Sequence, residues 1–183
     1  TFLSRCCAYL SFTILGAYLL FYLRGVLHEA IPEAASGLAT FQLLSTAILI
    51  PCALWAGWLS KRTGKIKNLA RRGADIMAVG LVVIAVFAVW GALVRGGVLF
   101  GAGFGLFLVV DIMLAIRVLP AQDARGKDLG LMYNAIYLPL ILSPIIGGAV
   151  LNLFHNNFAL LFALAAVSAV LAEALLWPLR SVS

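Results

Sequence analysis

The sequence predicts an all-α membrane protein, a polytopic bundle of six transmembrane helices that forms one domain over residues 1–183. The chain is 64% hydrophobic and only 11% charged, and its mean hydropathy of +1.09 lies far above the soluble range. Several apolar runs are close to the ~20 residues that a helix needs to cross ~30 Å of hydrocarbon. The alternating pattern of a membrane barrel is absent, so helices must satisfy the backbone within each segment.

Six apolar runs give the expected helices, in order along the chain: 6–23, 36–59, 74–94, 96–116, 129–153 and 158–179. The first connection contains His28, and the second is the basic segment SKRTGKIKNLARRG, residues 60–73. Only Arg95 and Gly96 separate the third run from the fourth. A longer polar loop, RVLPAQDARGKD, precedes the fifth run, and His155 lies between the last two. We therefore expect residues 60–73 to form a long basic loop.

The distribution of cations predicts the orientation. With the amino terminus inside, eleven of the thirteen Lys and Arg fall on the inner side, and only Arg24 and Arg95 fall outside. This bias predicts that both ends are cytoplasmic, in a bacterial inner membrane. The alternative for the basic segment is a nucleic-acid-binding arm. We reject nucleic acid as a partner, because the segment has no interleaved aromatic residues and no groove-entering motif.

The sequence carries no pattern typical of an enzyme, so we expect neither catalysis nor a cofactor nor a metal. Both histidines lie in expected loops, and no hydrolase, metalloprotease or paired-carboxylate motif is present. The run Gly101, Gly103 and Gly105 lies inside an apolar helix without a preceding strand, so it is no dinucleotide fingerprint. With Gly97, these glycines predict close approach of neighbouring helices.

Four stretches carry a family resemblance. GWLSKRTGKIK resembles the loop signature of the major facilitator superfamily at Gly57, Arg62, Gly64 and Lys65, although Lys61 replaces the acid before the arginine. The second stretch is VLPAQDARGKDLGLM, which matches the same family at Pro120, Arg125, Gly126 and Gly130. The third is SPIIGG at residues 143–148. The fourth is the opening LSRCCAYLSFTILGAYLLFYLRGVL, which is similar to the seventh helix of sugar:cation symporters.

The resemblance implies that this chain is the carboxyl-terminal half of a twelve-helix transporter, with two inverted three-helix repeats. It implies that the protein moves a small solute by alternating access, coupled to H⁺ or Na⁺. A sugar or glycoside is the first expectation for that solute. The expected partners are the lipid bilayer and the amino-terminal half of the same protein. A drug or metabolite exporter of the same superfamily is one alternative. A non-transporting membrane assembly subunit is the other.

Charged residues near the inner end are the coupling or gating candidates. Asp111 lies six residues before Arg117, inside the fourth helix, and intramembrane acids usually face a partner or a cavity. It is expected either to pair with Arg5 and hold the inner side closed or to carry the coupling cation. The resemblance adds Arg62, Lys65 and Arg125 as parts of the gating loops.

Two further acids have structural interpretations. Asp75 is expected at the start of the third helix, where an acid favours the positive helix end. Glu173 lies seven residues before Arg180, which predicts that the two share a face, and either pairing or snorkelling to the interface explains this acid.

Polar side chains inside the spans are the candidate solute-binding residues: Tyr9, Thr13, Gln42, Asn134 and Tyr137. Hydroxyl, amide and aromatic groups suit a sugar, although hydrogen bonds between helices explain the same residues. Breaks in the fifth helix are expected to form either a hinge or a static kink: Pro139, Pro144, Gly147 and Gly148.

Overall fold

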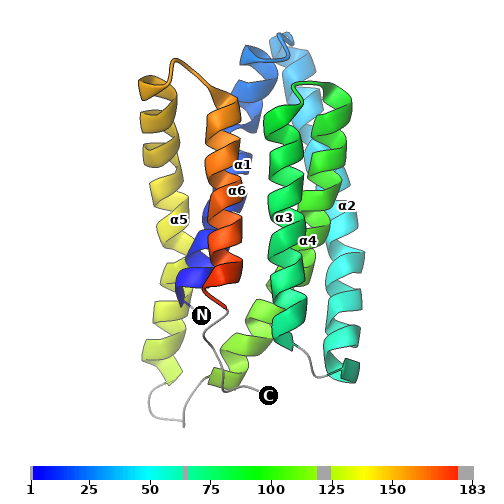
Figure 1. The fold of residues 1–183 in the computed structure, drawn as a ribbon, viewed down its shortest axis with the longest axis vertical. Coiled ribbons are helices and arrows are strands. Elements are labelled where there is room, and N and C mark those ends of the chain that lie inside the picture. The colour runs from blue at the N-terminus through cyan, green and yellow to red at the C-terminus, as the bar shows by residue number, and fades with distance from the viewer. Residues whose placement is uncertain (1, 64–65, 119–124, 177–183) are drawn as a thin grey trace.

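A computed structural model describes residues 2–63, 66–118 and 125–176, with side chains for all of these except 63, 66–67, 114–118, 125–129 and 131–132. These residues form six α-helices (Figure 1). In chain order they are α1 (Phe2–Gly25), α2 (Ile31–Thr63), α3 (Ile66–Val86), α4 (Trp90–Val118), α5 (Arg125–Leu153) and α6 (Phe158–Ala174). The predicted all-helical fold is confirmed for the described residues.

Four of these helices are long and apolar enough to cross a membrane, judged over the described residues. They are α1, residues 31–62 of α2, residues 90–113 of α4 and residues 133–153 of α5. The α6 helix is apolar but has only 17 residues, and α3 carries charge in its first half. Membrane crossing by all six helices therefore stays a prediction.

The basic segment is mostly helical, so the expected long loop is wrong. The α2 helix continues through Lys61 and Arg62, and α3 already begins at Ile66. Lysine and arginine are good helix formers, and cations stabilise the carboxyl end of a helix, so the last turn of α2 tolerates this charge. Asp75 consequently lies in the interior of α3, and the expectation that it begins the helix is also wrong.

The connection between α3 and α4 lies earlier than expected. The α3 helix ends at Val86 and α4 begins at Trp90, so Arg95 and Gly96 belong to α4. Residues 87–89 are Phe, Ala and Val, an apolar turn that hydropathy does not distinguish from a helix. Arg95 is exposed in the second turn of α4.

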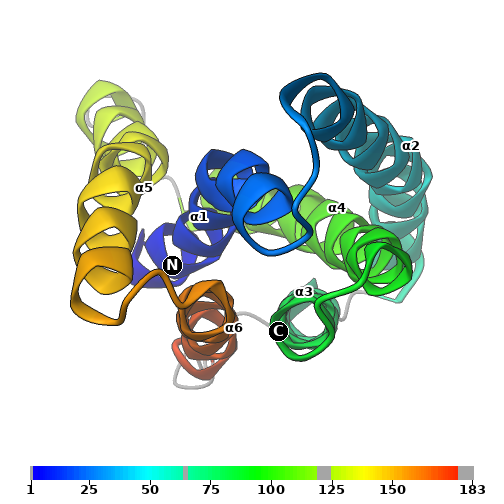
Figure 2. The same ribbon diagram turned by 90° about the horizontal axis from the view of Figure 1, so that it is seen from above.

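The helices pack in two groups of three, seen along the bundle in Figure 2. In one group α1 packs against α5 and α6; in the other α4 packs against α2 and α3. The groups meet mainly where α3 packs against α6. In Figure 2, α5 and α2 stand at the two sides, with α1 and α4 between them.

Glycines set the close approach of α3 and α4. A Cβ on Gly80 would lie 2.7 Å from the Gly96 carbonyl oxygen, and one on Gly103 would lie 2.6 Å from the Met77 nitrogen. Gly73 faces the backbone of Gly103 in the same way. Such distances leave no room for a side chain, so the two backbones are in contact.

A second face of α4 approaches α2. Gly101 lies against the backbone of Ser45, Gly105 lies against Leu49, and Gly97 lies against the ring of Phe41. The predicted close packing by the α4 glycines is thus confirmed. Gly103 contacts α3, whereas Gly97, Gly101 and Gly105 contact α2.

Serines join α1 to α6. Ser4 Oγ donates to the Ala172 carbonyl at 2.8 Å, Ser11 Oγ donates to Ala165 at 2.8 Å, and Ser168 Oγ donates to Cys7 at 2.7 Å. These bonds link antiparallel helices without any charged group, as expected for helices in lipid.

The two ends of the bundle differ in charge. The α1 helix begins at the end where α2 and α6 finish, and the turns after α1, α3 and α5 lie at the opposite end (Figure 1). Of the cations whose side chains the structure describes, Arg5, Lys61, Arg62, Arg71 and Arg72 lie toward the first end, which we call the basic end. Arg24 and Arg95 lie toward the other.

Candidate functional site

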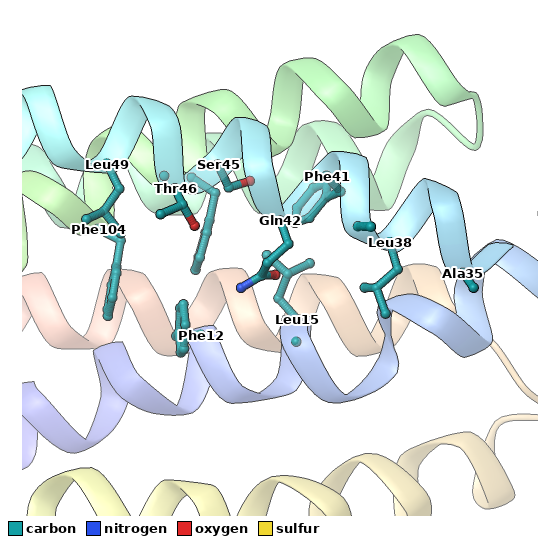
Figure 3. A pocket seen from close by; sticks show the side chains of 14 residues that line it. Phe12, Leu15, Ala35, Leu38, Phe41, Gln42, Ser45, Thr46, Leu49 and Phe104 are labelled. Atoms are coloured by element: carbon teal, nitrogen blue, oxygen red, sulfur yellow. The ribbon is translucent and has the colours of Figure 1, made fainter. Parts of the chain in front are cut away.

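A cavity of about 520 Å³ lies between α1, α2 and α4 (Figure 3). On α1 it is lined by Phe12, Leu15 and Gly16, and on α4 by Phe100, Gly101 and Phe104. The α2 lining comes from one face of successive turns between Ala35 and Leu49. No residue of α3, α5 or α6 in the described ranges lines it. The size suits a small organic molecule.

The polar groups of the cavity all come from α2. Gln42, Ser45 and Thr46 line it, and Figure 3 shows the Gln42 amide extended toward α1. Ser45 Oγ donates to the Gly97 carbonyl on α4 at 3.2 Å, so its hydroxyl proton is used in a bond between the two helices. Gln42 thus lines this cavity, while the prediction that it binds a solute stays a prediction.

Three nearly parallel phenyl rings form one wall. The Phe12 and Phe104 ring centroids are 4.6 Å apart with 11° between planes, and those of Phe100 and Phe104 are 6.2 Å apart with 5° between planes. Tyr9 packs edge-on against Phe104 at 5.6 Å. The wall is therefore a stack of apolar rings shared by α1 and α4.

Nearer the basic end, the same two helices are joined by a buried ion pair. Arg5 Nε donates to Asp111 Oδ2 at 2.5 Å, and Arg5 Nη2 donates to the Asp111 main-chain oxygen at 3.4 Å. Both side chains are only 8% exposed. The predicted pairing of Arg5 with Asp111 is confirmed.

The ion pair and the phenyl wall belong to one contact line, which we call the α1–α4 seam: Arg5, Tyr9 and Phe12 on α1 with Asp111, Phe104 and Phe100 on α4. Arg5 precedes Phe12 by seven residues and Asp111 follows Phe104 by seven, so the pair lies about 10 Å from the rings along each helix. The seam consequently connects the cavity to the basic end.

A second ion pair joins α3 to α6. Arg71 donates to Glu173 Oε1 through Nη2 at 2.8 Å and through Nε at 3.0 Å. The expected partner of Glu173, Arg180, lies outside the described residues, and the structure supplies Arg71 instead. This pair is more exposed, at 33% and 19%, so water weakens its attraction.

The remaining candidate solute-binding residues do not line this cavity. Thr13 is buried, and its hydroxyl donates to the Tyr9 carbonyl at 2.9 Å and toward Pro139 at 3.4 Å. Tyr9 lies behind the phenyl wall. Asn134 and Tyr137 share the exposed side of α5, as their spacing predicts, but α5 contributes nothing to the cavity.

The candidate hinge lies within a continuous helix, because α5 runs through both Pro139 and Pro144. Tyr18 on α1 donates to the Pro144 carbonyl at 2.8 Å, and its ring fills the space where a Gly147 side chain would be. Gly148 is exposed. These contacts attach α1 to α5 at the proline segment; whether the segment bends during function stays a prediction.

The gating candidates from the loops are only partly described. The Arg62 guanidinium lies 5.0 Å from the centre of the Trp58 ring, an arrangement that favours a cation–π interaction. Lys65 lies outside the described residues. Arg125 begins α5, but its side chain is not among those described.

Sequence reasoning missed Phe12, Phe100 and Phe104. An aromatic residue in an apolar helix looks the same whether it faces lipid or a cavity, although the four-residue spacing of Phe100 and Phe104 places both on one face. No group of three His, Cys, Asp or Glu residues could hold a metal within the part of the chain that the structure describes.

Comparison with known proteins supplies the family context. The chain matches the Major Facilitator Superfamily over residues 1–183. It is 27% identical to Myo-inositol transporter 3A of Cryptococcus neoformans var. grubii serotype A, with 90% of this chain and 29% of that protein covered.

Solved structures share the fold. A peptide transporter POT in complex with sulfate superposes with a TM-score of 0.82 at 22% identity, over 98% of this chain and 36% of that one. A POT family transporter in complex with 5-aminolevulinic acid gives 0.80 at 19% identity, over 98% and 37%. The chain thus spans little more than a third of these proteins, and less of the curated relative.

Proposed function

Because the chain belongs to the Major Facilitator Superfamily, whose members are membrane transporters and not enzymes, we propose that it is the carboxyl-terminal half of a secondary transporter. The solute is small and sugar-like, a sugar or glycoside, and its movement is coupled to H⁺ or Na⁺. The likeness to a myo-inositol transporter supports a solute of this size. The partner is an amino-terminal half that supplies the other wall of the transport site.

The orientation in this proposal places the basic end in the cytoplasm of a bacterium, with the protein in the inner membrane. The described cations at that end outnumber those at the other, which supports this orientation.

The α1–α4 seam is the observation that carries the proposal. Asp111 and Arg5 are buried together at the basic end, and the same helix faces carry the phenyl rings of the cavity. A solute against Phe12 and Phe104 therefore touches the two helices that the ion pair holds together. In the proposed cycle, the pair holds these helices together at the basic end while the cavity faces the other side, and it separates when the cavity opens inward.

Uptake by the whole protein in liposomes tests this mechanism. A radiolabelled sugar and glycoside panel, with and without an imposed proton or sodium gradient, should identify a solute that accumulates only with the gradient. Solute that equilibrates but never accumulates would contradict cation coupling.

Variants of the pair distinguish its two possible roles. Asp111→Asn and Arg5→Gln should each impair transport, because each leaves a buried partner uncompensated. The double variant should recover part of both uptake and exchange if the pair only holds the helices together. If Asp111 carries the coupling proton, the double variant exchanges solute but does not accumulate it. Wild-type uptake and exchange by Asp111→Asn would remove this residue from the mechanism.

A further inference from the structure

The chemistry of the cavity limits what can occupy it. Among its lining residues there is no Asp, Glu, Lys, Arg or His, and four are phenylalanines. A carboxylate, phosphate or ammonium group held against this wall would lose water without gaining a counter-charge from it. This half therefore suits the uncharged part of a solute.

The phenyl wall adds a shape requirement. Phe12, Phe100 and Phe104 lie within 16° of parallel in each pair. A planar aromatic group can extend this stack of parallel rings, whereas a chain of hydroxyl groups would lose hydrogen bonds to water there.

Two polar groups remain to orient that solute. Gln42 and Thr46 are one helical turn apart, both line the cavity, and neither side chain makes a hydrogen bond within the described residues. A lipid acyl chain in the cavity would leave both unsatisfied, which makes lipid a poor occupant. Within this half, two neighbouring groups alone do not satisfy the many hydroxyls of a bare sugar or polyol.

We propose that this cavity binds the flat apolar group of an uncharged amphipathic solute, such as the aromatic aglycone of a neutral aryl glycoside. Gln42 and Thr46 hydrogen-bond the polar atoms next to that group. The inference rests on the proposed transport function and makes it more specific: recognition by this half depends on the apolar group more than on the sugar.

Three probes that differ by one group each test the class of solute. They are phenyl β-D-glucoside, methyl β-D-glucoside and phenyl β-D-glucuronide, with equilibrium binding and uptake measured separately on the whole protein in liposomes. Phenyl glucoside should bind at least about tenfold more tightly than methyl glucoside, since apolar pockets discriminate on this scale. Phenyl glucuronide should bind more weakly than phenyl glucoside, because its carboxylate has no counter-charge in the wall.

A cavity-filling variant locates the binding. A Cβ on Gly16 meets no atom within 4 Å, and Gly16 lines the cavity, so Gly16→Leu places a side chain inside it without a backbone clash. This variant should weaken phenyl glucoside binding about tenfold or more. The matched control is Gly91→Leu, because Gly91 is equally open but lies outside the cavity.

Thr46→Val should weaken binding several-fold, whereas Thr40→Val, on the same helix and outside the cavity, should not.

The outcomes separate this inference from the transport function. Tighter binding of methyl glucoside or phenyl glucuronide, or equal binding by Gly16→Leu and Gly91→Leu, would overturn the inference even if the protein transports. Absence of binding by phenyl glucoside would overturn it as well. Phenyl glucoside binding that Gly16→Leu removes, without uptake of any solute, would support the inference and contradict transport.

Discussion

Arg5 and Asp111 exclude water from their contact, whereas the side chains of Arg71 and Glu173 are 33% and 19% exposed. The two pairs have the same chemistry in one chain, so they form a natural comparison. Removing one member of a buried pair leaves an uncompensated charge, while a partly hydrated charge can be solvated in place.

At the scale of single residues, Asp111→Asn should lower the free energy of unfolding by about 3 kcal/mol, as for a broken buried pair. Glu173→Gln should lower it by less than about 1 kcal/mol, because water compensates the arginine. The measurement is SDS-induced unfolding in mixed micelles. Arg5→Gln combined with Asp111→Asn should regain part of the loss. Equal losses for the two single variants would show that burial does not separate the pairs.

The closest helix contacts in this chain depend on glycine, which has no side chain to hold the backbones apart. The α3–α4 contact brings backbone against backbone at Gly80 and Gly103, whereas Gly16 on α1 faces open space. The same substitution therefore has opposite consequences at positions that look alike in the sequence.

At the scale of elements, Gly80→Ala and Gly103→Ala should each destabilise the bundle by about 1–3 kcal/mol, because the added methyl group forces two backbones apart. Gly16→Ala should be neutral or stabilising by up to about 1 kcal/mol, since alanine is the better helix former. Thermal unfolding in detergent measures all three. Similar melting temperatures for Gly80→Ala and Gly16→Ala would contradict the close contact.

Part of this arrangement could be predicted from the sequence. An intramembrane acid usually faces a partner or a cavity, so the sequence alone offers the Asp111–Arg5 pair as one of two interpretations. Hydropathy does not locate the end of α3, because residues 87–89 are as apolar as the helices on either side of them. The hydropathy pattern was equally uninformative about the carboxyl end of α2, since lysine and arginine neither break a helix nor require a loop.

The candidate site was predicted less completely than the fold. Gln42 stood out because polar residues are rare in apolar spans, and it does line the cavity. Asn134 and Tyr137 stand out for the same reason, but they lie on the exposed side of α5, a helix that does not line the cavity. Rarity shows that a residue needs an explanation; only the packing of helices shows which surface it faces.

Over the whole molecule, neighbours in sequence are often not neighbours in space. The first helix packs with the last two, and α4 packs with the two that precede it. Two interlocked three-helix repeats would produce this pattern, with α1 corresponding to α4. That relation stays a prediction, as does the orientation of the bundle in the membrane.

At this scale, cysteines at Lys65 and Asn156 test the orientation in a variant whose native cysteines are serine. The α2 helix ends and α3 begins at the basic end, whereas Asn156 follows α5 at the opposite end, so an impermeant maleimide should label the two cysteines from different sides (Figure 1). Lys65→Cys should react from the cytoplasm. Labelling of both from one side would contradict the bundle as a membrane-spanning unit.

The packing of α1 against α5 and α6 has a consequence for biogenesis. Along the chain, 100 residues separate the end of α1 at Gly25 from the start of α5 at Arg125, which corresponds to roughly 5–20 s of translation. The α1 helix therefore meets its α5 and α6 neighbours late in synthesis, while α3 and α4 can associate as soon as both have left the ribosome. Until α6 is made, Ser4 and Ser11 lack the α6 carbonyl oxygens that they bond in the finished bundle, whereas Arg5 can meet Asp111 once α4 is complete. We therefore expect α1 to complete its packing late in biogenesis, against α2, α3 and α4 that are already made.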